Sequence, residues 1–212
     1  MFGTVLPATT QASLAVLSKL AEIQQSYLAG GTALALQFGH RESDDLDFFT
    51  QHEFEPQVLV EFFQRQMADF KLERTAWGTI LGYIGKVKFS LFYLKYPLLR
   101  ETHEWQGIRI ADVVDIAAMK IAALSDRSTK RDFTDLFFLL KQFSLDEMFN
   151  FYDQKYGIWE QQQFHILRAL VYFDEAELGD MPRMLKEVEW KQIREKVSQS
   201  VQGYMKGQKI MG

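Results

Sequence analysis

The residues with the strongest potential for chemistry are two glycines and a hydroxyl, followed thirteen residues later by two carboxylates. Gly30, Gly31 and Thr32 follow a short apolar segment and open a helical pattern, and Asp45 and Asp47 stand one residue apart in a strand-like segment. Backbone N–H groups at a helix start favour a phosphate. Paired carboxylates hold a divalent cation. The combination predicts an enzyme that transfers a nucleotide from a triphosphate.

The glycine-threonine turn has two interpretations. It is either a tight turn in which Thr32 is the N-cap of a helix, or a phosphate cradle in which the glycines let the backbone approach closely and the hydroxyl caps the helix or touches a phosphate oxygen. A helix over Thr32–Phe38, with Gly39 as its C-cap, would bring the following strand back beside Tyr27–Ala29. That return favours the second interpretation, because it places the acidic pair near the turn.

The acidic pair also has two interpretations. In a strand, residues i and i+2 point to the same face, so Asp45 and Asp47 would stand side by side and Asp44 would face the other way. The segment is either a solvated, aspartate-rich strand edge or a site for Mg²⁺, which orients a triphosphate and activates an attacking oxygen. Leu46 and Phe48 are expected to be buried on the opposite face, which favours the metal site.

A lysine lies on the apolar face of a later helix. The segment Asp112–Leu124 has helical spacing, with Asp112 placed as N-cap and with one face made of Val113, Ile116, Ala117, Ala123 and Leu124. Lys120 falls in the middle of that face. It either extends its ammonium out to solvent or meets a phosphate or a carboxylate in a cleft.

A charged segment follows this helix. Asp132 and Asp135 are expected in the first turn of an apolar helix over Phe133–Leu140, where negative charge suits the helix dipole and capping is the simpler role. The best basic cluster of the chain lies here, either a solvated turn or a small nucleic-acid patch, and it consists of Arg127, Lys130 and Arg131.

The remaining pattern predicts an α+β fold. Apolar spacing favours helices over Thr10–Gln24 and from Pro56 through Val58–Met67. Strands are expected at Leu46–Phe49, Phe70–Arg74, Gly78–Ile84, Val87–Tyr93 and Ile108–Ile110. The chain is helical from Asp112 almost to its end. We therefore expect an α/β core over 1–111 and a helical region over 112–212 that completes the active-site cleft.

Composition limits the remaining classes of protein. The 212 residues are 47% hydrophobic and include 18 Phe, which is ample for a buried core. The net charge of −4 argues against a large nonspecific nucleic-acid surface. There is no cysteine, so disulfides and thiolate zinc sites are excluded. Neither a signal peptide nor an apolar run of about 20 residues is evident, so we expect a cytoplasmic protein without a membrane partner.

Two long motifs carry a resemblance to a known family. The stretch Tyr27–Phe49, YLAGGTALALQFGHRESDDLDFF, resembles throughout the first motif of AbiEii/AbiGii-type nucleotidyltransferases, the toxins of abortive-infection systems. The stretch from Asp115 to Leu136 is similar to the later helical motif of that family, at Lys120, Arg127, Arg131, Asp132 and Asp135. The resemblance covers nearly the whole chain.

The family belongs to the DNA polymerase β-like nucleotidyltransferases, so the resemblance implies a mixed sheet flanked by helices with a mostly helical C-terminal half. It implies that Asp45 and Asp47 bind Mg²⁺ and act in catalysis together with Lys120. It also implies that Gly31 and Thr32 contact the β- and γ-phosphates. The full implied nucleotide-binding set is Gly30, Gly31, Thr32, Arg41, Ser43, Lys120 and Asp132.

The resemblance also implies partners. Relatives transfer nucleotides, some of them onto the 3′ end of tRNA, and some prefer GTP or pyrimidine triphosphates. Many are toxins encoded beside a repressor-like antitoxin. We therefore expect an NTP substrate, an RNA acceptor such as tRNA, and a cognate antitoxin protein.

One departure from the superfamily pattern leaves alternatives open. Polymerase β-like enzymes usually supply a third metal-binding carboxylate from a later strand, whereas Gly85–Tyr93 contains no acid and has Lys86, Lys88 and Ser90 at the expected positions. A catalytically inactive nucleotide-binding module is therefore an alternative. Another is an antitoxin-binding protein, suggested by aromatic residues of the C-terminal half that are more often core, namely Phe143, Phe149, Phe151, Tyr152, Tyr156 and Trp159.

Overall fold

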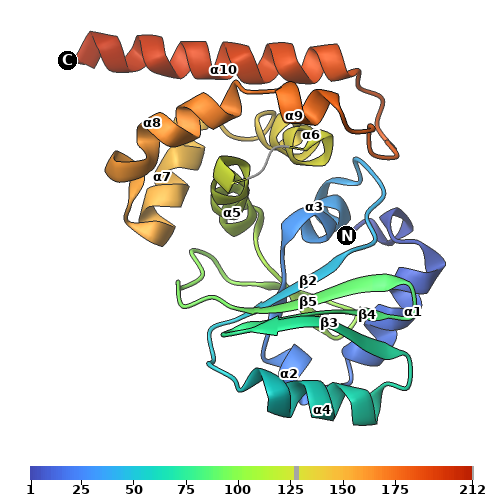
Figure 1. The fold of residues 1–212 in the computed structure, drawn as a ribbon. Helices are drawn as coiled ribbons and strands as arrows, with labels where there is room; N and C mark the ends of the chain where they lie inside the picture. Colours follow the sequence, from blue (N-terminus) through green and yellow to red (C-terminus); the bar gives the residue numbers. More distant parts are fainter. Residues whose placement is uncertain (127–128, 212) are drawn as a thin grey trace. The chain divides into compact units, whose positions relative to one another are not determined.

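The computed structural model describes residues 1–126 and 129–211, so Arg127 of the predicted basic cluster lies outside the described residues. The chain divides into two compact units, one over Met1–Asp112 and one that begins at Val113. The first contains the whole β-sheet and the second is helical (Figure 1). The predicted α+β class is confirmed.

The first unit is built on a mixed sheet of seven strands in the order β3-β4-β5-β2-β1-β7-β6. Its strands are β1 (Tyr27–Leu28), β2 (Leu46–Thr50), β3 (Phe70–Ala76), β4 (Thr79–Ile84), β5 (Val87–Tyr93), β6 (His103–Trp105) and β7 (Ile108–Ile110). Strand β2 pairs antiparallel with β1 and parallel with β5. The expected return of the chain beside its first strand is therefore confirmed. The short edge strand β6 was not predicted.

The helical elements of this unit are η1 (Gly3–Val5), α1 (Ala8–Leu17), α2 (Ala21–Gln24), α3 (Gly30–Phe38) and α4 (Pro56–Gln66). The single helix predicted over Thr10–Gln24 is wrong, because the chain leaves the helix after Leu17 and Leu20 is extended. The side chain of Gln24 donates a hydrogen bond to the Ser18 carbonyl at 3.0 Å across this break. Leu17, Leu20 and Ile23 are buried despite the break, which explains the misleading periodicity.

The two faces of the sheet are distinct around β2. Leu46 and Phe48 are fully buried, while Asp47 between them is half-buried on the other face. The ring of Phe48 lies 6.1 Å from Phe89 of β5, and Phe63 of α4 lies 5.4 Å from Phe89. Helix α4 therefore covers the Phe48 face, and α3 lies on the Asp47 side (Figure 1).

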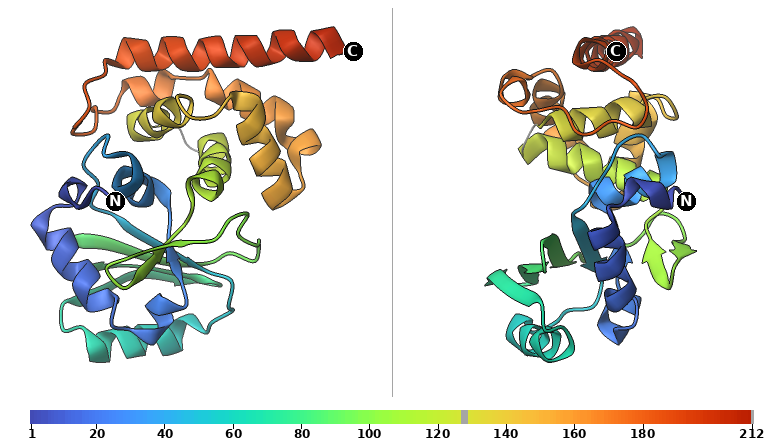
Figure 2. Two further views of the ribbon diagram at one scale, coloured as in Figure 1. Left: turned by 180° about the vertical axis from the view of Figure 1, so that it is seen from behind. Right: turned by 90° about the vertical axis from the view of Figure 1, so that its right-hand side faces the viewer.

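The second unit is a helical bundle. Its helices are α5 (Val113–Asp126), α6 (Lys130–Leu139), α7 (Leu145–Tyr156), α8 (Trp159–Leu170), α9 (Asp174–Glu177) and α10 (Trp190–Met211). Helix α5 packs against α6, α7 and α8, and α10 runs across the same three helices (Figure 2). The bundle core is formed by residues from all of these helices, including Ile116, Ile121, Phe133, Leu136, Met148, Ile166 and Ile193.

The aromatic residues singled out in the C-terminal half differ in how deeply they are buried. Phe149 and Tyr152 are buried, as their interpretation as core residues predicts, whereas Phe143, Phe151 and Tyr156 are half-buried. The side chain of Trp159 lies outside the described part. Within the described residues, no helix is both long enough and apolar enough to cross a membrane.

Candidate active site

The glycine-threonine turn joins β1 directly to α3. Ala29 is the residue before the helix, and its N–H donates to the Asp47 carbonyl at 3.0 Å. Helix α3 begins at Gly30, two residues earlier than predicted, so the interpretation of Thr32 as the N-cap is wrong. No side chain at the N-cap position accepts from the first turn of α3. The predicted C-cap at Gly39 is confirmed by its left-handed conformation.

Gly30 lies directly against Asp47. Its φ is +70°, and a Cβ placed on it would come within 3.3 Å of Asp47 Oδ2. Any larger residue would therefore both strain the backbone and press on that carboxylate. The start of α3 and the Asp47 carboxylate form one continuous feature.

The Thr32 hydroxyl holds the loop that carries the first aspartate. Its Oγ1 donates to the Asp45 carbonyl and lies 2.8 Å from Ser43 Oγ, which therefore donates to it. Thr32 is only 1% exposed, and Ser43 and Arg41 are also buried. Arg41 donates to the Glu42 carbonyl at 2.9 Å. These predicted nucleotide-binding residues thus meet around one loop, where they order the backbone before Asp45.

The two aspartates do not share one strand as predicted. Strand β2 begins at Leu46, so Asp45 belongs to the preceding loop and only Asp47 is a strand residue. Both are half-buried, and the expected burial of Leu46 and Phe48 is confirmed. The strand therefore begins one residue after Asp45, whose carbonyl accepts a hydrogen bond from the Thr32 hydroxyl.

The neighbour of Asp47 on β5 is Ser90. The parallel register pairs the two residues, and Ser90 Oγ donates a hydrogen bond to Asp47 Oδ1. Ser90 is 2% exposed. The described residues contain no group of three or more His, Cys, Asp or Glu side chains that could hold a metal ion. A hydroxyl therefore occupies the position beside Asp47 that could have supplied a third carboxylate.

Lys120 meets carboxylates rather than solvent. Its Nζ lies 3.2 Å from Asp132 Oδ1 and 2.8 Å from Asp135 Oδ2, and the three side chains are 7%, 6% and 0% exposed. Thr129 caps α6 by accepting from the Asp132 N–H, and its hydroxyl donates to Asp132 Oδ2 at 2.6 Å. Asp135 was wrongly predicted in the first turn, since α6 begins at Lys130. Asp135 lies three residues after Asp132, which places both carboxylates on one face of a helix. That spacing was the sequence signal that both could contact Lys120.

Replacement of Gly30 by Ala tests the close approach at the turn. We expect the free energy of unfolding to fall by about 1–2 kcal/mol, because alanine is strained in the left-handed region and its Cβ would displace Asp47. Gly203→Ala is the matched control, since a Cβ there meets nothing within 4 Å in the middle of α10. It should raise the free energy of unfolding by about 0.5–1 kcal/mol. Urea denaturation measures the free energy of unfolding of both variants. Equal effects of the two substitutions would contradict the close approach of Gly30 to Asp47.

Comparisons with known proteins agree on the type of fold. JHP933 from Helicobacter pylori superposes with a TM-score of 0.56 at 19% identity and covers 97% of this chain and 96% of its own. MenT4, the nucleotidyltransferase toxin Rv2826c from Mycobacterium tuberculosis H37Rv, superposes with a TM-score of 0.59 at 14% identity, covering 92% of this chain and 82% of its own. The architecture is therefore that of nucleotidyltransferases.

Sequence comparison identifies the family. The uncharacterized protein aq_aa25 of Aquifex aeolicus (strain VF5) is 36% identical over 191 residues, which cover 84% of this chain and 87% of that protein. The family described as nucleotidyl transferase AbiEii toxin of type IV toxin–antitoxin systems matches residues 13–90 and 93–203. Because these matches span most of the chain, the protein belongs to the AbiEii family of nucleotidyltransferase toxins.

Proposed function

We propose that this protein transfers a nucleoside monophosphate from an NTP onto an acceptor hydroxyl in a reaction that depends on Mg²⁺. The observation that carries the proposal is the close approach of the start of α3 to Asp47, whose Oδ2 lies within 3.3 Å of the Cβ position of Gly30. A triphosphate bound at the helix start would therefore lie beside the Asp47 carboxylate. Family membership supplies the reaction type.

The donor set fits Mg²⁺. Asp45 and Asp47 provide carboxylate oxygens, which this ion prefers, and it usually takes only one or two carboxylates plus substrate phosphates. The absence of a Cβ at Gly30 leaves room next to Asp47 Oδ2. The ion when bound would neutralise phosphate charge and lower the pKa of an attacking oxygen.

The residues of this chain have separate roles in the proposed reaction. The N–H groups of Gly30 and Gly31, which lack intrahelical acceptors at a helix start, bind phosphate oxygens. Thr32 and Ser43 fix the loop that carries Asp45, and Ser90 orients Asp47 through the hydrogen bond to Oδ1.

The bond changes define what these residues must support. The acceptor oxygen bonds to the α-phosphorus, the bond from that phosphorus to the bridging oxygen breaks, and pyrophosphate leaves while the acceptor proton passes to a base. The proposal extends to Lys120 and Asp132, together with Arg41, as nucleotide contacts, supported by the motifs of the family that contain them.

The test is incorporation of labelled NTP with Mg²⁺ into total tRNA and other RNA, with each of the four NTPs in turn. We expect transfer by the wild type that is abolished by EDTA. Lys120→Arg keeps the charge that faces Asp132 and Asp135 but changes the shape of the cation. It should therefore lower the rate of nucleotidyl transfer while leaving the free energy of unfolding nearly unchanged. No product with any acceptor, together with no NTP binding by calorimetry, would overturn the proposal.

A catalytically inactive nucleotide-binding module is the second candidate. Ser90 beside Asp47, in place of a third carboxylate, is the observation that favours it. It predicts thermal stabilisation by NTP with Mg²⁺ and no turnover, and incorporation into any acceptor would exclude it. Family membership also supports an antitoxin partner. Growth arrest on induced expression that disappears with a co-expressed neighbouring gene product would support that partner.

A further inference from the structure

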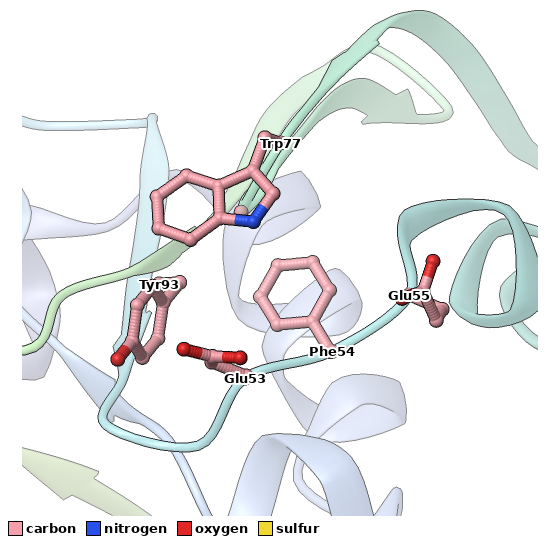
Figure 3. Close-up of a pocket in the computed structure, with 6 residues that line it drawn as sticks. Glu53, Phe54, Glu55, Trp77 and Tyr93 are labelled. Atoms are coloured by element: carbon pink, nitrogen blue, oxygen red, sulfur yellow. The ribbon is translucent and has the colours of Figure 1, made fainter.

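A pocket of the first unit is lined by aromatic rings and carboxylates. It has a volume of about 140 Å³ and is lined by Glu53, Phe54, Glu55, Trp77, Gly78 and Tyr93. These residues come from the β2–α4 connection, the β3–β4 turn and the end of β5. Figure 3 shows the rings of Trp77, Phe54 and Tyr93 around the Glu53 carboxylate, with Glu55 at the other end of the pocket.

The rings are held in place by the backbone. The Tyr93 N–H donates to the Gly78 carbonyl at 2.7 Å, and a Cβ on Gly78 would come within 2.9 Å of the Tyr93 Cβ. Trp77 and Tyr93 meet edge to face, with ring centroids 5.4 Å apart and planes at 87°. Trp77 is nevertheless 77% exposed. The pocket is thus a preformed feature with a large aromatic side chain facing solvent.

The two glutamates of the pocket are exposed to solvent. Glu55 precedes α4 but makes no side-chain capping hydrogen bond. Glu53 is exposed and lies within hydrogen-bond reach of the Tyr93 hydroxyl. Burial, followed by the charge and hydrogen bond of Glu53, raises the pKa of Tyr93 above its ordinary value.

This pocket is separate from the candidate active site. On strands β2 and β5, the pair Asp47–Ser90 lies three residues before the pair Thr50–Tyr93. The active-site pair and the pocket residue Tyr93 are therefore about 10 Å apart along the strands. Side chains three residues apart in a strand also point to opposite faces of the sheet. Tyr93 therefore belongs to the face that α4 covers, opposite to Asp47 and Ser90.

The chemistry of the lining selects a cation. The faces of aromatic rings attract ammonium and guanidinium groups, and two carboxylates attract them further while repelling phosphates. The volume of about 140 Å³ is below the roughly 300 Å³ of a pocket for a drug-sized ligand, which suits a small cationic group. We propose that this pocket binds an organic cation, an alkylammonium or alkylguanidinium group, carried either by a free polyamine or by a lysine or arginine side chain.

The test uses the full chain labelled with 5-fluorotryptophan, with the Trp77 resonance assigned through Trp77→Phe. Butylammonium should shift that resonance saturably in the millimolar range, and 1-butanol, of similar size but uncharged, should bind at least about tenfold more weakly. Glu53→Gln should weaken butylammonium binding about tenfold, as expected for loss of a charged partner. Glu73→Gln, at an exposed position of β3 outside the pocket, is the matched control and should leave binding unchanged.

Two further ligands separate the sources of the cation. Spermidine represents a free polyamine, and Nα-acetyl-lysine amide and its arginine counterpart represent protein side chains. The class of ligand that binds with the higher affinity identifies the source of the cation. Equal binding of butanol and butylammonium, or equal loss in Glu53→Gln and Glu73→Gln, would overturn the proposal. A larger shift with uridine monophosphate than with butylammonium would do so as well, because it would identify a base-stacking surface. None of these readouts depends on nucleotidyl transfer.

Discussion

Asp47→Asn should lower the rate of nucleotidyl transfer by about 10²–10⁴-fold, because electrostatic stabilisation by a bound metal ion is worth several kcal/mol and each 1.36 kcal/mol is a factor of ten. The amide keeps the shape of the side chain and can still contact Ser90, so the fold should be retained. Transfer of labelled nucleotide under saturating NTP and Mg²⁺ measures the loss. Calorimetric titration of NTP with Mg²⁺ should show weaker binding in the same variant.

Asp44→Asn is the matched control for this effect. It makes the same change of charge three residues earlier, at an exposed side chain, and the Asp44 carbonyl, which accepts from Thr10, is not altered. We expect transfer within about twofold of the wild type, since surface substitutions of this kind have small effects. If Asp44→Asn and Asp47→Asn lost activity equally, the metal assignment would be wrong and overall charge would be the cause.

The second large effect concerns stability. Lys155→Met should lower the free energy of unfolding by about 3–5 kcal/mol, as is typical when one partner of a buried ion pair is removed. Lys155 Nζ lies 2.8 Å from Asp115 Oδ1, and both side chains are 0% exposed. The change would leave the Asp115 carboxylate in the bundle core without the ammonium that it faces. Urea denaturation, followed by circular dichroism, measures the change.

Two variants make this prediction decisive. Lys191→Met removes the lysine of an exposed pair with Glu195, whose lysine side chain is 73% exposed, and should cost less than about 0.5 kcal/mol. The double variant Lys155→Met/Asp115→Leu should recover most of the lost stability, because apolar residues of similar volume can replace a buried pair. A double variant no more stable than Lys155→Met alone would show that the loss arises from packing rather than from charge.

Local patterns in the sequence identified most of the candidate site. Gly30, Gly31 and Thr32 are recognisable because a helix opens directly after a strand, and Leu46 and Phe48 are buried as predicted. Lys120 was recognisable because a charge in the middle of an apolar helix face must either reach solvent or meet an anionic partner. The errors lie at boundaries, where a side chain such as Thr32 or Gln24 competes with the backbone for hydrogen bonds.

The sequence by itself therefore determined the class of fold and the family and suggested the residues of the proposed chemistry, since these depend on neighbouring positions. Only the tertiary structure decided that Ser90 stands beside Asp47, that Lys155 pairs with Asp115 and that Trp77 meets Tyr93. These partners are between 16 and 43 residues apart in the chain. Strand register and helix packing bring them together through the burial of apolar faces shared by many residues, which no local pattern specifies.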